Sequence, residues 1–255
     1  MGLAALWKSW GVIPSAIMGH SVGEVAAACI AGILTLEQAA HIIVLRGRCM
    51  DDHTPEGGGM LAVGMTPEEA AAVIARHDTT VSIAAFNGPQ SLTLAGRKSS
   101  LEAIAAELDA EEIFARFLKV SHPFHHEMMQ PSATALREAL EGLSPGPESL
   151  PFFSTVTGGR LAGASCDADH WAGGVRLPVQ FAATVNNLAG YGIDIWLEVG
   201  AHPALVRSLQ ECLTGQPAKP TILASMRRER EQESLLETAM DLHLAGVGLD
   251  FKAIT

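Results

Sequence analysis

The sequence predicts an α/β protein, in which a mainly parallel β-sheet is covered by helices and carries a smaller inserted α+β subdomain. Three observations lead to this prediction. Short apolar runs alternate with longer amphipathic runs over most of the 255 residues, as in sheets whose parallel strands are joined by helices. Hydrophobic residues make up 48% of the chain, enough to bury a sizeable core. Between about 60 and 120 the order changes to strand, helix, strand, strand, helix, strand, which is the split βαβ pattern of a ferredoxin-like unit.

The first elements are a short buried strand and two helices. "PSAIMG" predicts the strand, and the helix that follows spans about 22–31 and ends at Gly32. "TLEQ", residues 35–38, matches a capping box, in which Thr and Gln side chains satisfy free N–H groups at a helix start. We expect that helix to end near Cys49 and "DDHTPEGGGM" to form a mobile loop.

The inserted subdomain starts at "MLAVGM", which predicts a strand. "TPEE", residues 66–69, is a second capping box with Pro67 at the first helical position. "VSIAAFNG" and "QSLTLAG" predict a hairpin around Asn87, Gly88 and Pro89. "SSLEAIAAELDA" predicts a helix and "IFARFLKV" the last strand of the subdomain.

After the inserted subdomain, the pattern of the main sheet and its covering helices resumes. The elements expected are a helix at roughly 127–143, a strand at "FFSTVTG", a helix after Pro178, a strand at "DIWLEVG", a helix at "HPALVRSLQECL", a strand at "TILASM" and a helix from about Arg230. We therefore predict a core formed by residues 1–59 and 121–225, an inserted subdomain at 60–120, and a C-terminal helix with the start of a linker at 226–255.

Composition excludes several classes of protein. The net charge of −11 disfavours nucleic acid and anionic membranes as partners, because both require basic surfaces. No apolar run is long enough to cross a membrane, and the first residues lack the charged region and cleavage site of a signal peptide. The four cysteines are far apart and form no CxxC pair, so they read as buried thiols of a cytoplasmic protein.

The sequence "GHSVG", residues 19–23, matches G-x-S-x-G at a point where a strand turns into a helix. Such a turn presents a serine at its tip, and flanking glycines leave room for tight packing. Ser21 is therefore a candidate nucleophile, and the backbone N–H of Val22 could face a developing oxyanion at the helix N-terminus. The simpler alternative is an ordinary turn in which Ser21 caps the helix.

A serine nucleophile needs a base, and the densest histidine cluster is "SHPFHHEMM" with His122, His125 and His126. A metal site is the competing interpretation. It is disfavoured because no HxxxH or CxxC partner lies nearby in the sequence. His20, next to Ser21, points to the other side of the turn and is a poorer candidate for the base.

Arg46 lies in an otherwise apolar helical stretch, "AAHIIVLRG". A buried guanidinium needs an anionic partner, and no acidic residue lies one turn before it. A salt bridge to Asp51 or Glu24 is one possibility. The planar fork of arginine, which binds carboxylates through two hydrogen bonds, favours a substrate carboxylate instead.

Six motifs occur in a characteristic order and spacing: "GHSVGEVAAACIAG", "VLRGRCM", "NGPQSLTLAG", "VSHPFHHEMM", "LPVQF" and "WLEVGAHPAL". Together they resemble the acyltransferase domains of modular polyketide synthases, which are related to malonyl-CoA:acyl-carrier-protein transacylases. The resemblance spans residues 1 to about 245. It implies an α/β-hydrolase-like core with a ferredoxin-like insertion, in agreement with the pattern of predicted elements.

The resemblance also implies roles for single residues. Ser21 would be the nucleophile, and His125, which ends "HPFH", its base. The backbone carbonyl of Gln180 would orient the imidazole, and Arg46 would receive the free carboxylate of the extender unit. Five further residues would line or shape the acyl pocket: His20, Asn87, His122, Pro123 and Phe124.

The implied reaction moves an acyl group from a CoA thioester through an acyl-serine to the phosphopantetheine thiol of an acyl carrier protein. It requires no metal and no organic cofactor. Partners would be acyl-CoA, the carrier protein and other polyketide synthase domains. "HPFH" is similar to the "HAFH" form associated with malonyl rather than the "YASH" form associated with methylmalonyl, and Val22 also matches the malonyl type, so a malonyl extender is expected.

Two alternatives stay open at this point. A serine hydrolase such as a thioesterase would need an acid between Ser21 and His125, and Asp51, Asp52 and Glu56 qualify by order alone. A non-catalytic fragment would form no acyl-enzyme. Domains of the resembled family begin with a strand and a "GQGSQ"-type loop that this chain lacks, so we expect residues 1–255 alone to be weakly active.

Overall fold

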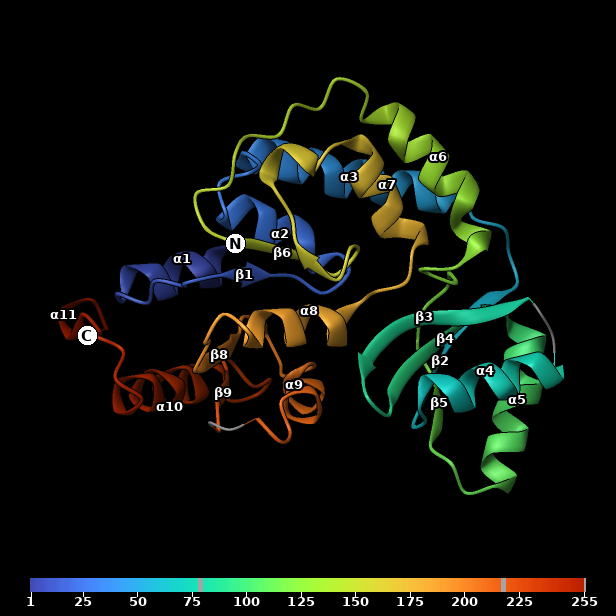
Figure 1. The fold of residues 1–255 in the computed structure, drawn as a ribbon. Helices are drawn as coiled ribbons and strands as arrows, with labels where there is room; N and C mark the ends of the chain where they lie inside the picture. Colours follow the sequence, from blue (N-terminus) through green and yellow to red (C-terminus); the bar gives the residue numbers. More distant parts are fainter. Residues whose placement is uncertain (78–79, 217–218, 255) are drawn as a thin grey trace. The chain divides into compact units, whose positions relative to one another are not determined.

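The computed structural model describes residues 1–77, 80–216 and 219–254 (Figure 1). Thr255, the end of the predicted C-terminal segment, lies outside the described residues. The chain divides into two compact units. The larger unit is Ile17–Thr184, and the smaller unit combines Met1–Ala16 with Val185–Thr255.

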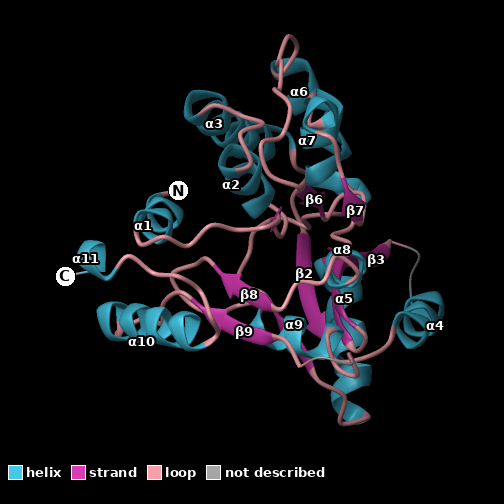
Figure 2. Ribbon diagram, turned by 60° about the vertical axis from the view of Figure 1, so that its left-hand side comes forward, coloured by secondary structure: helices cyan, strands magenta, loops and turns pink. Residues whose placement is uncertain are grey.

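In the larger unit, a small sheet lies among helices. Strand β1 (Ile17–Met18) runs parallel to β6 (Phe152–Ser154), which pairs antiparallel with β7 (Gly159–Arg160). Figure 2 shows helices gathered on one side of β6. They are α2 (Gly23–Ile30), α3 (Leu36–His53), α6 (Gln130–Ala139) and α7 (Ala168–Arg176). The short 3-10 helices η1 (Glu127–Met129) and η2 (Gly163–Ser165) precede α6 and α7. Helix α8 (Phe181–Ala189) follows α7, and only its first residues, up to Thr184, belong to this unit.

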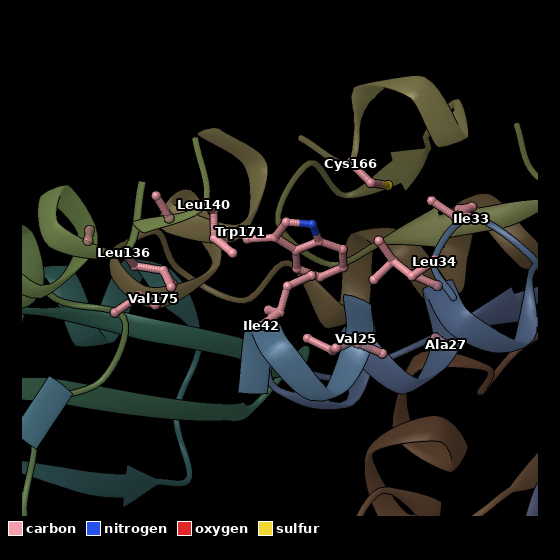
Figure 3. Packing of buried hydrophobic residues seen from close by; sticks show 14 of the residues in the cluster. Val25, Ala27, Ile33, Leu34, Ile42, Leu136, Leu140, Cys166, Trp171 and Val175 are labelled. Atoms are coloured by element: carbon pink, nitrogen blue, oxygen red, sulfur yellow. The ribbon is translucent and has the colours of Figure 1, made fainter. Parts of the chain in front are cut away.

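The core of this layer forms around Trp171 of α7, which Figure 3 shows against Val25 and Ile42. Phe152 of β6 is fully buried in the same cluster. Each such side chain stabilises the fold by about 1.5–3 kcal/mol relative to exposure. The packing of α2 and α3 against this cluster therefore places the turn between β1 and α2.

Helix α3 begins where the sequence predicts, since Thr35 and Gln38 form the full capping box. It ends at His53 rather than near Cys49. Met50 is buried in the core, and the N–H of Thr54 donates to its carbonyl, so the last turn is retained. Thr54 precedes a proline, which disfavours helical backbone at that residue and ends the helix there.

The inserted subdomain has the ferredoxin-like order. Its elements are β2 (Gly58–Val63), α4 (Pro67–His77), β3 (Val81–Gly88), β4 (Ser91–Arg97), α5 (Lys98–Ala110) and β5 (Ala115–Phe117). The strands form one antiparallel sheet in the order β3-β4-β2-β5. Leu101 and Ile104 of α5 pack with Leu61 and Leu94 of the sheet in a core of their own. This confirms the ferredoxin-like subdomain predicted from the sequence.

The smaller unit holds a two-stranded parallel sheet of β8 (Ile195–Glu198) and β9 (Thr221–Ala224). Its helices are α1 (Gly2–Ser9), α9 (Val206–Cys212), α10 (Glu231–Leu244) and α11 (Phe251–Ile254). Trp7 and Trp10 meet edge to face at 5.3 Å between ring centroids, and the Trp7 Nε1–H donates to Ser225 Oγ at 2.9 Å. Across the described residues, every helix is too short or too polar to span a lipid bilayer.

Candidate active site

Ser21 lies at the tip of the turn from β1 into α2, as predicted. Its φ is 52°, a left-handed conformation that few non-glycine residues adopt. Gly19 permits this turn, because a Cβ there would lie 2.4 Å from the backbone nitrogen of Glu24. A Cβ at Gly23 would meet nothing within 4 Å, so only Gly19 is required by close packing, although the sequence suggested both.

The backbone N–H of Val22 is available for a ligand. Among the described residues no acceptor is recorded for it, whereas the N–H groups of Gly23 and Glu24 donate to the carbonyls of His20 and Ser21. Val22 is the N-cap of α2, so its N–H lies beside the positive end of the helix dipole. This arrangement can stabilise an anion that forms at Ser21.

His125 is the histidine that meets Ser21. Its Nε2 lies 2.6 Å from Ser21 Oγ, and its Nδ1 lies 2.9 Å from the carbonyl oxygen of Leu177. A carbonyl only accepts hydrogen bonds, so Nδ1 carries the proton and Nε2 accepts from the serine hydroxyl. The His125 backbone N–H also donates to the carbonyl of Val175 at 3.0 Å, and its φ of 62° is left-handed as well.

The carbonyl that orients the imidazole is that of Leu177, so the prediction of Gln180 was wrong. The carbonyl of Gln180 instead accepts from the N–H and the hydroxyl of Thr184, at 3.0 and 2.7 Å, in the first turn of α8. The prediction was right about the kind of group: a main-chain carbonyl, not a carboxylate, meets Nδ1.

Only 5% of the surface of His125 is exposed, and this burial controls the protonation of its imidazole. The pKa of His125 falls from 6.5 to about 4, chiefly because the imidazole is removed from water. The Leu177 carbonyl opposes this shift, and the charges of Arg46 and His20 contribute to it. The imidazole is therefore neutral near pH 7 and can accept a proton.

A small pocket joins Ser21 to Arg46. It is lined by Ser21, Val22, Glu24, Val25, Ile42, Arg46, Val156, Trp171 and Gly174. Burial lowers the pKa of the Arg46 guanidinium, and among the described residues no carboxylate forms a salt bridge with it. Neither Asp51 nor Glu24 pairs with Arg46, so its charge is free to meet an anion in the pocket.

The other predicted pocket residues lie around this pair. Phe124 stacks beside Arg46, with the guanidinium carbon 5.9 Å from the ring centroid. His122 contacts the Phe124 ring at 5.6 Å between centroids, and its Nε2 lies 3.4 Å from Asp51 Oδ1. Pro123 packs on Gly58 of β2, where a Cβ would lie 2.5 Å from the proline ring.

The imidazole of His20 meets the inserted subdomain at Asn87. Its Nε2 lies 2.7 Å from Asn87 Oδ1, and the Asn87 amide donates to Thr93 at 3.3 Å. This contact ties the Ser21 turn to the hairpin of the inserted subdomain. His126 is turned away in a similar manner, because its Nδ1 accepts from the N–H of Met128.

The thiols offer no competing nucleophile in this region. Burial raises the pKa of Cys166 to about 12 and also raises the pKa values of Cys29 and Cys49. Thiols of this kind stay protonated at neutral pH. Ser21 is thus the group in this pocket that an adjacent base can activate.

Sequence reasoning did not assign six of the lining residues to the pocket: Glu24, Val25, Ile42, Val156, Trp171 and Gly174. Val156 and Gly174 lie in a turn and in a helix that no motif marks as functional. Leu177 was also missed, because its contribution comes from the main chain and leaves no side-chain signal.

A family model described as "Acyl transferase domain" matches residues 1–248. The chain belongs to this acyl transferase domain family. A curated relative, the spectinabilin polyketide synthase system protein NorA' of Streptomyces orinoci, is 35% identical over 257 residues, a match that covers 100% of the chain and 7% of that relative. The chain therefore spans only a small part of the length of this relative.

Solved structures agree with this assignment. The acyltransferase domain from module 8 of the salinomycin polyketide synthase superposes with a TM-score of 0.93 at 30% identity, over 98% of this chain and 59% of that one. A malonyl-transacylase solved in complex with a type II polyketide synthase acyl-carrier protein has a TM-score of 0.82 at 27% identity, over 94% of this chain and 78% of that one. The acyltransferase domain described here therefore has the predicted α/β-hydrolase-like core with its ferredoxin-like subdomain and is a transferase.

Proposed function

We propose that this domain transfers a malonyl-type acyl group from CoA, through an ester on Ser21, to the phosphopantetheine thiol of an acyl carrier protein during polyketide assembly. The observation that carries the proposal is the 2.6 Å contact between Ser21 Oγ and His125 Nε2 at a pocket that also holds Arg46, an arginine with no salt-bridge partner among the described residues. The similarity to a malonyl-transacylase bound to a carrier protein supports the choice of acyl group and acceptor. Neighbouring polyketide synthase domains would be further partners.

In the first step, Ser21 Oγ attacks the thioester carbonyl while its proton passes to His125 Nε2. The carbonyl oxygen becomes an oxyanion, which the N–H of Val22 stabilises by about 3 kcal/mol. The C–S bond then breaks, and the proton on Nε2 moves to the sulfur of departing CoA. The product is acyl-Ser21, with His125 neutral again.

In the second step, the carrier thiol attacks the ester carbonyl and gives its proton to His125 Nε2. The C–O bond to Ser21 breaks, and the proton returns to Oγ. No metal and no organic cofactor takes part in this proposal, since CoA and the carrier's phosphopantetheine are both substrates. The neutral Leu177 carbonyl at Nδ1 provides orientation without the negative charge that the aspartate of a hydrolase triad provides.

Arg46 would hold the free carboxylate of the malonyl group. The guanidinium lines the same pocket as Ser21, and it is partly buried without a protein carboxylate among the described residues. A planar fork can bind both carboxylate oxygens, and the low dielectric of a partly buried site strengthens that contact.

We expect malonyl to be preferred over methylmalonyl. Phe124 lies against Arg46 and packs against two clusters of buried hydrophobic residues, one around Trp171 and one that includes Met60. Its ring is therefore fixed beside the position of the substrate carboxylate and can occupy the space of a 2-methyl branch. One methyl group provides about 1–3 kcal/mol of discrimination. Competition between the two CoA esters for one enzyme sample measures the ratio, and a preference for methylmalonyl would contradict this assignment.

The deciding experiment is the intact mass of the protein after mixing with malonyl-CoA. One malonyl group should be added, it should move to a holo carrier protein on addition, and Ser21→Ala should abolish both events. His125→Ala should lower the rate by about 10²–10⁴-fold, whereas the matched control His126→Ala should not. Release of free malonate without transfer to the thiol would identify a hydrolase, and acylation of Ser21→Ala would exclude Ser21 as the nucleophile.

A further inference from the structure

Glu24 is a buried carboxylate that the acyl-transfer chemistry does not use. It lies three residues after Ser21, in the first turn of α2, and is 2% exposed. Its Oε1 accepts hydrogen bonds from the backbone N–H groups of Thr155 and Val156, the latter at 3.1 Å. Its Oε2 lies 3.1 Å from Nε2 of His170. A buried carboxylate costs free energy unless hydrogen bonds or an opposite charge compensate it. The partners of Glu24 come from the turn that contains Thr155 and Val156 and from the His170 side chain.

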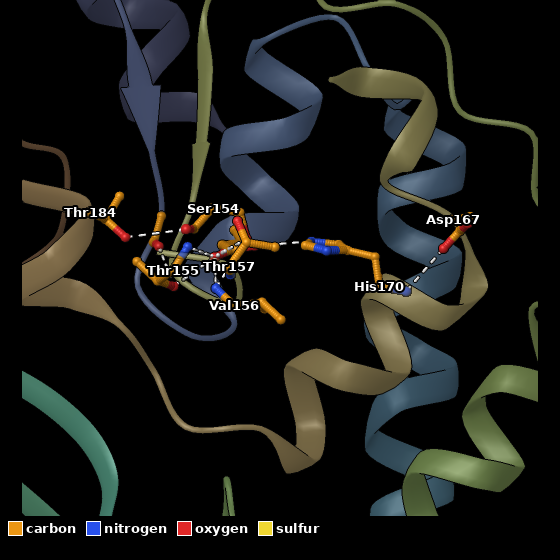
Figure 4. A network of polar contacts seen from close by, with 9 residues as sticks. Ser154, Thr155, Val156, Thr157, Asp167, His170 and Thr184 are labelled. Atoms are coloured by element: carbon orange, nitrogen blue, oxygen red, sulfur yellow. Dashed lines mark hydrogen bonds and ion pairs between the residues drawn. The ribbon is translucent and has the colours of Figure 1, made fainter. Parts of the chain in front are cut away.

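The second partner connects this carboxylate to another helix. Figure 4 shows the ring of His170 pointing from α7 toward the turn of Ser154, Thr155 and Val156. His170 is in the first turn of α7, where its backbone N–H donates to Asp167 at 3.0 Å. The Glu24–His170 contact therefore joins the start of α2 to the start of α7, across 146 residues of sequence.

The other end of α7 holds the base. The carbonyl of Val175, in the last turn, accepts from the backbone N–H of His125 at 3.0 Å. The carbonyl of Leu177, the first residue after the helix, accepts from Nδ1 at 2.9 Å. A displacement of α7 relative to α2 would thus move His125 relative to Ser21.

Both members of the Ser21–His125 pair also need external support. They are two of the four non-glycine residues with positive φ in the described part of the chain. Such conformations persist only where the surrounding structure fixes them. A displacement of about 1 Å between reacting groups can cost as much as 10²-fold in rate.

From these contacts we propose that Glu24 and His170 form a positioning link, which sets the distance between Ser21 and His125 by fixing α7 against the start of α2. The proposal rests on the proposed role of Ser21 as the nucleophile. Neither residue touches the reacting atoms: Glu24 acts through the helix that follows Ser21, and His170 acts through the helix that holds His125.

The test compares two polar variants that differ by one methylene. The amide of His170→Gln reaches the position of the imidazole Nε2 and can donate to Glu24, whereas the amide of His170→Asn is too short. A fluorophosphonate probe reports on the activated serine alone, because Ser21 Oγ displaces fluoride whatever acyl group the domain takes. Acylation by malonyl-CoA, resolved into its saturating rate and half-saturating concentration, is measured in parallel.

We expect His170→Asn to lower the fluorophosphonate rate and the saturating acylation rate at least tenfold, with the half-saturating concentration of malonyl-CoA unchanged. His170→Gln should stay within about threefold of the parent domain. The matched control is Ser132→Ala, which removes the 2.8 Å hydrogen bond between the fully buried Ser132 and Thr54 in the same unit and should change stability without changing either rate.

Equal rates for His170→Asn and His170→Gln would overturn the link. Should His170→Asn not fold, His170→Leu provides the second variant, since an aliphatic side chain fills the place of the imidazole and cannot form a hydrogen bond with Glu24 in any tautomer. An unchanged fluorophosphonate rate in His170→Leu would likewise overturn the link. If the parent domain reacts with the probe but not with malonyl-CoA, the proposed substrate fails and the link is still tested. If the parent reacts with neither, the nucleophile itself is wrong.

Discussion

The burial of His125 leads to a specific pH dependence of acylation. A general base works only while it is neutral, so the acid limb of the rate profile reports the pKa of that base. An exposed histidine, with a pKa of about 6.5, would lose most of its base form below pH 6. Burial lowers the pKa of His125 to about 4, so its base form should persist to much lower pH.

The size of the effect follows from these two values. At pH 5, a histidine with a pKa of about 4 is roughly nine-tenths neutral, whereas one with a pKa of about 6.5 is about 3% neutral. The rate of Ser21 acylation at pH 5 should therefore stay near its neutral plateau, about 30-fold above the value that an exposed histidine would give.

The assay is single-turnover acylation between pH 4 and 8, followed by quenching and intact mass, with circular dichroism to confirm folding at each pH. Excess acyl-CoA of fixed concentration keeps binding constant within the series. A rate that falls to half its plateau near pH 6.5 would refute the reasoning, because it would show that the base is solvated when it reacts.

Three more outcomes are expected. Because the pKa of His125 is lower in the folded chain, the unfolded chain binds a proton first as the pH falls. The free energy of unfolding should therefore fall by about 1.4 kcal/mol per pH unit between about pH 6.5 and about pH 4. Urea melts of His125→Gln should lack this pH dependence, and the same pH dependence in the variant and the parent would contradict the prediction. Arg46→Ala should impair malonyl transfer far more than acetyl transfer, measured as kcat/KM for each ester, because only malonyl presents a carboxylate; equal losses would make Arg46 structural. Gly19→Ala should lower stability by at least about 1–3 kcal/mol in thermal or urea melts, because its Cβ would lie 2.4 Å from backbone of α2, whereas the matched Gly23→Ala should be tolerated; equal melting points would show that the turn can move.

Local interactions account for what the sequence predicted well. Both capping boxes, at Thr35 and Thr66, form as expected because each joins residues only three apart. The order of elements in the inserted subdomain was predicted for the same reason, since hydrophobic periodicity is a local signal. The approach of His125 to Ser21 was predicted from the motif order and is present at hydrogen-bond distance.

The errors concern longer-range geometry and weak helix formers. Helix α7 escaped prediction because Gly173 and Gly174 oppose helix formation, and tertiary packing of Trp171 and Val175 overrides that preference. The wrong carbonyl, Gln180 instead of Leu177, reflects the path of a loop over three residues, which no propensity specifies. The pairing of Glu24 with His170 is likewise invisible in the sequence, because nothing local in either residue names its partner.

The main-chain carbonyl at His125 Nδ1 affects which amino-acid substitutions such a site can accept during evolution. A side chain that orients a histidine can be lost by a single codon change, but the Leu177 carbonyl is present whichever amino acid occupies that position. Its role is encoded by the course of the backbone, so position 177 can vary freely in identity while the orienting group is inherited intact. A search for the third member of a triad by residue type would find a dyad here and overlook a partner that is always present.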